Sequence, residues 1–204
     1  IPLPTQTGNL IVTLPGTVAG DPLLFSTHLD TVPLCAGAVP VRKKNKIHPE
    51  GRTALGGDNR TGVAALVTLA ATLIANKLPH PPITLLFTVR EESGLFGARH
   101  LDPADLGGVV MGFNIDGRQP NDLIAGAVGA ERWEVEITGK ASHAGAHPEQ
   151  GISATLVAAL AIAEVKHSGY FGKITLDGKV GTSNVGSFGG ADGKPAGDAT
   201  NVVT

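Results

Sequence analysis

The 204-residue sequence has little cysteine, few aromatic residues and no surplus of charge of either sign. Its single cysteine, Cys35, excludes an intramolecular disulfide framework and a thiolate metal site, and it fits a reducing compartment. With 16 Lys and Arg against 18 Asp and Glu, the chain has no basic surplus to neutralise nucleic-acid phosphates. No apolar run reaches the roughly 20 residues that a membrane-spanning helix needs. We therefore expect no nucleic-acid partner, no membrane partner and, by default, a cytoplasmic location.

The composition that is present suits a globular chain rich in tight turns, because 42% of the residues are hydrophobic and 28 are glycine. Apolar segments typical of strands lie at residues 9–14, 23–27, 83–89 and 109–115. Apolar residues repeat every three or four positions at residues 60–78, which predicts a helix, and a short helix is expected at 96–100. This order of strands and helices predicts an α/β fold with a doubly wound, mostly parallel sheet.

The pattern changes after Gly117. Residues 132–138 alternate in the manner of a half-exposed strand, residues 152–165 form an Ala-rich amphipathic pattern typical of a helix, and 174–176 favour a further strand. We therefore predict an α/β domain at 1–118 and a smaller α+β domain at 119–204. Residues 39–47 are expected to form an exposed, basic ribbon.

Polar residues follow the apolar strands at their carboxyl ends, where open α/β sheets bind ligands. They are His28 and Asp30 after the second strand, Asp58 before the long helix, Glu91 and Glu92 after the third strand, and Asp116 after the fourth. Because side chains alternate along a strand, Asp30 lies on the same face as His28 and can hold one ring nitrogen while the other faces a metal. Taken alone, a histidine in such a triplet is more often a core or surface residue than a ligand, and Asp58 could simply cap the helix.

Glu91 and Glu92 are adjacent acids directly after a buried strand, which is unfavourable unless positive charge lies nearby. One of the two can bind a metal while the other takes a proton from the attacking water. Asp116 supplies a further oxygen ligand. One histidine with three carboxylates suits zinc, and also manganese or cobalt, so the spacing leaves the metal open.

His143 lies in a predicted loop between a strand and a helix. It is either an exposed loop residue or a donor to the oxyanion of a tetrahedral intermediate.

Five segments in order resemble the aminoacylase and carboxypeptidase family of co-catalytic zinc metallohydrolases. They are residues 27–33, 55–62, 90–94, 114–117 and 142–145. The resemblance is closest to the peptidase T branch, whose typical features also include residues 145–154, 189–190 and 199–203. It covers nearly the whole chain and implies a phosphorylase/hydrolase-like catalytic domain with an inserted lid and dimerisation domain.

The resemblance also implies a role for each candidate residue. Two zinc ions are expected: His28 and Asp116 bind one, Glu92 binds the other, and Asp58 bridges them. By the same resemblance, Asp30 orients His28 and Glu91 is the general base. His143 would lie in the lid and, in dimeric members, reach the active site of the partner subunit, and Asn201 would help to bind substrate.

The implied activity is removal of N-terminal residues from short peptides, as in a tripeptide aminopeptidase acting as a homodimer. Related deacylases of acyl-amino acids, carboxypeptidases and a non-catalytic metal-binding or dimerisation module are the alternatives. Family members begin with helices before the first strand and end with a segment that carries a final histidine ligand. Since this chain stops at Thr204 without a matching histidine, we expect a fragment that binds the second metal poorly, and an inactive fragment is a further alternative.

Overall fold

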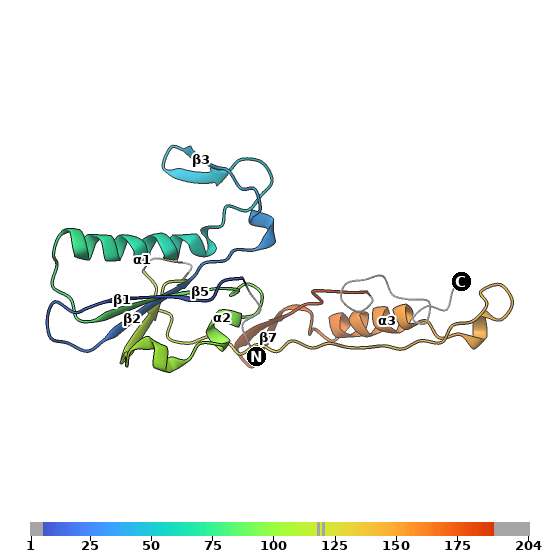
Figure 1. The fold of residues 1–204 in the computed structure, drawn as a ribbon. Helices are drawn as coiled ribbons and strands as arrows, with labels where there is room; N and C mark the ends of the chain where they lie inside the picture. Colours follow the sequence, from blue (N-terminus) through green and yellow to red (C-terminus); the bar gives the residue numbers. More distant parts are fainter. Residues whose placement is uncertain (1–5, 118, 120, 190–204) are drawn as a thin grey trace. The chain divides into compact units, whose positions relative to one another are not determined.

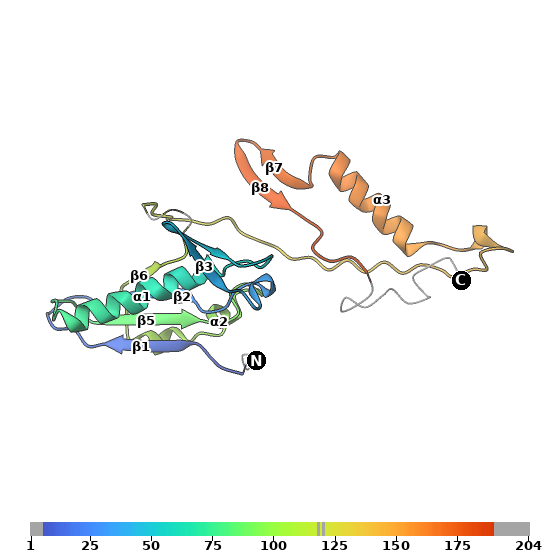
Figure 2. The same ribbon diagram turned by 90° about the horizontal axis from the view of Figure 1, so that it is seen from above.

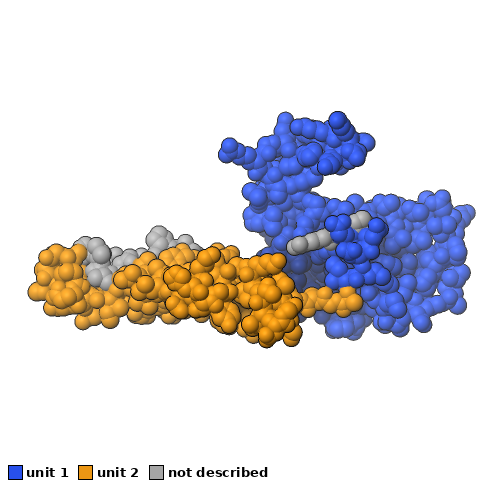
Figure 3. Space-filling model, turned by 180° about the vertical axis from the view of Figure 1, so that it is seen from behind, with its two compact units in different colours: residues 1–124 blue, residues 125–204 orange. Residues whose placement is uncertain are grey.

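The structure is a computed structural model that describes residues 6–117, 119 and 121–189. The chain divides into two compact units, Ile1–Ile124 and Ala125–Thr204, which Figure 3 colours separately. Each unit is described by itself below. The predicted functional division at residue 118 falls inside the first unit and stays a prediction, since compactness assigns no role to either part.

The first unit is built on a four-stranded sheet in the order β1-β5-β2-β6 (Figure 1). The strands are β1 (Leu10–Leu14), β2 (Leu23–His28), β5 (Ile83–Thr88) and β6 (Met111–Asn114). Strand β2 is parallel to both β5 and β6, whereas β1 runs antiparallel to β5. The predicted α/β class is confirmed, with a mixed sheet.

Helix α1 (Gly57–Ala75) covers one face of this sheet (Figures 1 and 2). Its buried Leu66 packs in one cluster with Ile83, Leu85 and Phe87 of β5. Val63, Ala70 and Leu73 of the predicted repeat pack against this cluster, whereas Val67 and Ile74 are exposed. The helix ends before the predicted Leu78 because Lys77 adopts a left-handed φ of 49°.

The shorter predicted elements of the first unit also form. Strands β3 (Pro40–Lys43) and β4 (Lys46–Pro49) pair as an antiparallel ribbon. The remaining elements are the helix α2 (Phe96–Arg99) and the 3-10 turns η1 (Pro33–Cys35) and η2 (Pro103–Leu106). No helix within the described ranges combines the length and the apolar character needed to cross a membrane.

The apolar run at residues 109–115 contains the strand β6, but an apolar run of this kind also predicts a buried strand, and that prediction is wrong. All four residues of β6 are exposed, although Phe113 stacks on Phe25 with ring centroids 5.4 Å apart. The reason is that β6 is an edge strand of the described sheet and pairs only with β2. In contrast, β5 pairs on both sides and its first five residues are buried.

The second unit contains α3 (Ala154–His167), the hairpin β7 (Gly172–Leu176) and β8 (Lys179–Ser183), and the 3-10 turn η3 (Pro148–Gln150). The Ser153 side chain caps α3 by accepting a hydrogen bond from the Leu156 N–H. The strand predicted at residues 132–138 is absent from the structure, and Trp133 is 81% exposed. Strands β7 and β8 form a two-stranded sheet, and this alternating segment does not pair with either of them.

Candidate metal centre

The strand register places the carboxyl ends of β2, β5 and β6 side by side at the same end of the sheet. His28 ends β2 and lies opposite Thr88 of β5, while Ser26 lies opposite Asn114 of β6. The residues that follow β5 and β6 therefore extend beyond the sheet beside His28. The connection from β2 through α1 leads to β5 on one side, and β6 returns on the other side of β2. Such a reversal of strand order is where open α/β sheets bind ligands.

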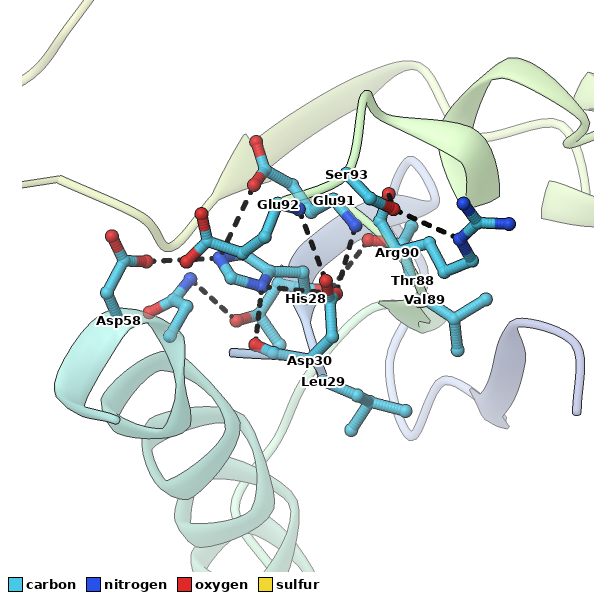
Figure 4. A network of polar contacts seen from close by, with 12 residues as sticks. His28, Leu29, Asp30, Asp58, Thr88, Val89, Arg90, Glu91, Glu92 and Ser93 are labelled. Carbon is cyan, nitrogen blue, oxygen red and sulfur yellow. Dashed lines mark hydrogen bonds and ion pairs between the residues drawn. The ribbon is translucent and has the colours of Figure 1, made fainter. Parts of the chain in front are cut away.

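His28 is the buried residue of the site, with 2% of its side chain exposed. Its Nδ1 lies 3.0 Å from the backbone carbonyl oxygen of Asp30, which can only accept, so Nδ1 carries a proton. The other ring nitrogen, Nε2, points toward the carboxylates, as Figure 4 shows for Asp58 and Glu91. The distances from Nε2 are 3.1 Å to Asp58 Oδ1, 3.9 Å to Asp116 Oδ1 and 4.0 Å to Glu91 Oε2.

Three residues offer ligand atoms that could share one ion. One atom each from His28, Asp58 and Glu92 lies within 4.8 Å of the other two. Asp116 lies beside the same nitrogen of His28 but outside this tight group. An imidazole nitrogen with carboxylate oxygens is a donor set that binds zinc and other divalent ions.

The electrostatics of the site favour a bound cation. Burial lowers the pKa of His28, but the hydrogen bond to Asp58 and the charges of the other acids raise it above 6.5 overall. Burial raises the pKa of Glu91 and of Asp116, and neighbouring acids add to this effect against the lowering influence of His28. The centre therefore holds an excess of negative charge, which protons or a divalent cation can offset.

Asp30 makes a contact that sequence analysis did not anticipate. Its carboxylate accepts hydrogen bonds from the backbone N–H groups of Glu91 at 3.0 Å and Glu92 at 3.2 Å, as Figure 4 shows. The same carboxylate lies 3.5 Å from Nδ1 of His28, farther than the backbone oxygen of Asp30. Asp30 thus links the end of β2 to the acidic turn. Because the partners are more than sixty positions apart in sequence, no local pattern marks this link.

Asn59 is a residue to which the sequence analysis assigned no role of its own. Its side chain is 5% exposed and hydrogen-bonded inside the first unit. Asp58 and Asn59 depart from helical dihedral angles at the start of α1, and the peptide bond between them is cis. A sequence cannot distinguish a buried amide from an exposed cap, since both stand at the beginning of a helical pattern.

The remaining candidates lie in the second part of the chain. His143 is an exposed residue of the second unit, and its Nδ1 accepts hydrogen bonds from the N–H groups of Gly145 and Ala146, both at 3.1 Å. The neutral ring therefore carries its proton on Nε2, which is free to donate. Asn201 lies outside the described residues.

Comparisons with known proteins show which family the chain belongs to. The profile of peptidase family M28 matches residues 9–155. The uncharacterized protein YqjE of Bacillus subtilis is 36% identical over 197 residues, which cover 96% of this chain and 49% of YqjE. The chain spans about half the length of the curated relatives it matches.

Two solved structures are similar as well. The aminopeptidase PepT from Bacillus cereus is 35% identical with a TM-score of 0.52. The match covers 77% of this chain and 42% of the PepT chain. A tripeptidase from Staphylococcus aureus is 27% identical with a TM-score of 0.58. The match covers 84% of this chain and 46% of the tripeptidase chain. The family match spans most of the chain, and the resemblance to peptidase T is confirmed. The chain belongs to peptidase family M28 and is similar to peptidase T over the part of those proteins that it covers.

Proposed function

We propose that the protein is a metal-dependent peptidase that removes N-terminal residues from short peptides, with tripeptides as the preferred class. The observation that carries this proposal is the convergence of His28, Asp58 and Glu92 at the carboxyl end of β2, with Glu91 beside them. The similar structures of an aminopeptidase and a tripeptidase support the choice of substrate.

The proposal places two divalent ions at this centre. In this proposal His28 and Asp116 hold one ion, Glu92 holds the other and Asp58 is shared between them. Zinc is the first candidate, and manganese or cobalt would accept the same donors. Such ions, when bound, polarise a scissile carbonyl and lower the pKa of water.

Glu91 is the proposed general base. Its Oε2 lies 4.0 Å from Nε2 of His28, so it reaches the edge of the centre while its partly buried carboxylate stays accessible to water. Its raised pKa makes it a better proton acceptor than an ordinary glutamate once it is ionised. Glu91 would take the proton from the attacking water and then donate it to the leaving amine. Asp30 holds the backbone of this turn in place through the Glu91 and Glu92 N–H groups.

A hollow of about 280 Å³ adjoins the candidate metal ligands. Asp58 and Glu92 stand at its border, and Val32, Cys35 and Leu55 contribute apolar walls. Because a hollow of this kind takes up apolar side chains, it supports a small peptide with an apolar residue next to the scissile bond.

The second unit is proposed to act as a lid and as the homodimerisation domain, inserted into a doubly wound catalytic domain. His143 would donate its Nε2–H to the oxyanion, and the bonds to its Nδ1 support this tautomer. Asn201 would contact substrate. The proposed location is the cytoplasm.

The same centre could serve an acyl-amino-acid deacylase or a carboxypeptidase, so the assay must separate these reactions. The full-length protein loaded with zinc is supplied in turn with a tripeptide, an N-acyl-amino acid and a peptide blocked at its N-terminus. We expect release of the N-terminal residue from the tripeptide to be the fastest reaction. Faster cleavage of either other substrate would move the protein to the corresponding activity, and no cleavage of any would favour a non-catalytic metal-binding module.

The Glu91→Gln variant tests the mechanism. It removes the proton acceptor while keeping the size of the side chain, so kcat should fall by about 10²-fold to 10⁴-fold, with zinc content unchanged. Glu50→Gln, at an exposed position beside β4, is the matched control and should retain wild-type kcat. Full activity of Glu91→Gln would show that the base has been assigned wrongly.

A further inference from the structure

The buried side chain of Asn59 joins three separate segments of the first unit. Its Nδ2 donates to Thr27 Oγ1 at 2.9 Å and to the backbone oxygen of Ile115 at 2.6 Å. Its Oδ1 accepts from the N–H of Gly62 at 3.1 Å. Only a primary amide supplies two donors and an acceptor in so short a side chain, so neither aspartate nor leucine can replace this set of bonds.

Each segment joined in this way carries a candidate metal ligand directly beside the joined residue. Thr27 precedes His28, Ile115 precedes Asp116, and Asn59 itself follows Asp58. Neighbouring Cα atoms are held at a fixed spacing of about 3.8 Å or less by the peptide bond. The amide of Asn59 therefore restrains, through one covalent link each, the positions of three ligands that come from distant parts of the sequence.

The helix packs closely on the strand ends around Asn59. A Cβ at Gly62 would lie 2.4 Å from both the Ile115 oxygen and Thr27 Oγ1, which are the same two atoms that bind Asn59. The first turns of α1 thus press directly on the ends of β2 and β6. This close approach explains a glycine inside a helix, where it costs about 1 kcal/mol relative to alanine.

We propose that Asn59 is a positioning residue of the metal centre, which sets the spacing of His28, Asp58 and Asp116. This inference rests on the proposed metal-dependent function. It predicts that loss of the amide weakens metal binding in a chain that still folds, because the ligands remain but their spacing relaxes. A residue that served only the stability of the fold would leave the metal affinity of the folded protein unchanged.

The test compares substitutions that remove the Asn59 hydrogen bonds with the substitution of a matched asparagine elsewhere. Asn59→Leu keeps the size of the side chain and removes all three bonds, while Thr27→Val removes one anchor without touching the helix. Asn76→Leu is the control, because Asn76 is the C-cap residue of the same helix and its Nδ2 bonds only to the Thr72 oxygen among the contacts described. Each full-length protein is stripped of metal and titrated with zinc against a chromophoric chelator. Circular dichroism and the Tm of the metal-free form report on folding.

We expect Asn59→Leu to lower zinc affinity by about 10-fold to 100-fold, the range found for groups that orient metal ligands. Thr27→Val should shift it in the same direction by a smaller factor, and Asn76→Leu should bind as the wild type does. Wild-type affinity in a folded Asn59→Leu protein would overturn the proposal. If Asn59→Leu does not fold, wild-type affinity in Thr27→Val overturns it instead. Failure of the unmodified protein to bind any divalent ion would remove the proposed function as well, so the two failures are distinguishable.

Discussion

The two units differ in how their apolar residues are used. In the first unit, hydrophobic side chains of α1 and β5 meet in a buried cluster that includes Leu66 and Leu85. In the second, the helix α3 has a similar apolar content, yet Leu160 is 61% exposed. The buried hydrophobic residues of the described chain all belong to the first unit except Ala154.

This difference explains how the first unit can hold the candidate metal centre in a fixed geometry. Charged side chains can be held close together only where a packed core fixes the backbone that carries them. The ends of β2, β5 and β6 are fixed in this way by the sheet and α1. The helix and hairpin of the second unit are instead held mainly by local bonds, such as the Ser153 cap. We therefore expect substitutions of the same kind to have unequal effects in the two units.

The largest expected difference concerns leucine truncation. Leu85→Ala removes a side chain that is 2% exposed at the centre of the sheet, and it should lower the free energy of unfolding by about 2–5 kcal/mol. Leu160→Ala, on the exposed face of α3, should change it by less than about 0.5 kcal/mol. Urea unfolding followed by circular dichroism measures both. An equal loss of unfolding free energy in the two variants would mean that Leu160 is packed against a partner in solution, and the contrast between the two units would fail.

A smaller difference is expected for glycine. Gly62→Ala places a Cβ against the Ile115 oxygen and Thr27 Oγ1, and overpacking of this kind costs about 1–3 kcal/mol even after the gain in helix propensity. A Cβ at Gly181 in β8 meets no atom within 4 Å, so Gly181→Ala should be close to neutral. Thermal unfolding of the two variants side by side decides the point. A stable Gly62→Ala protein would show that α1 can move away from the sheet at little cost.

Much of the first unit could be predicted from the sequence because its signals are local. The helical repeat of α1 and the continuous apolar run of β5 are each visible within one segment, and both elements form close to the expected residues. The candidate ligands were found for a related reason: His28 ends β2, and the acids follow directly after strands or precede a helix. The rule that ligands gather at the carboxyl ends of parallel strands then predicts that they meet.

The errors fall where a residue depends on a distant partner. Residues 132–138 have the alternation of a strand, but a strand also needs an edge to pair with. The exposure of β6 depends on its place at the border of the sheet, which the sequence of β6 does not encode. The bonds from Asn59 to Thr27 and from Asp30 to the Glu91 N–H likewise join residues that only the tertiary fold brings together.

The smallest expected effect is a change of stability with pH in the metal-free protein, and it should arise in the first unit. The folded-state pKa of His28 lies above 6.5, so the folded protein binds more protons than the unfolded chain there. The raised pKa values of Glu91 and Asp116, ordinarily 4.5 and 3.8, act in the same direction. Each contribution is complete below the ordinary pKa and is lost as the pH rises through the folded-state value. The metal-free protein should therefore lose stability progressively from about pH 4 to above pH 6.5.

Thermal unfolding of chelator-treated protein at several pH values measures this trend, and two histidine substitutions locate its source. His28→Asn removes the group around which the acids gather, and it should flatten the part of the profile near neutral pH. His147→Asn changes an exposed histidine of the second unit and should leave the profile as it was. Zinc should reverse the trend in the unsubstituted protein, because protons compete with the metal for the same ligands and binding tightens as they leave. If His147→Asn altered the dependence of thermal stability on pH and His28→Asn did not, the pH response would arise in the second unit. That outcome would contradict the difference between the units described above.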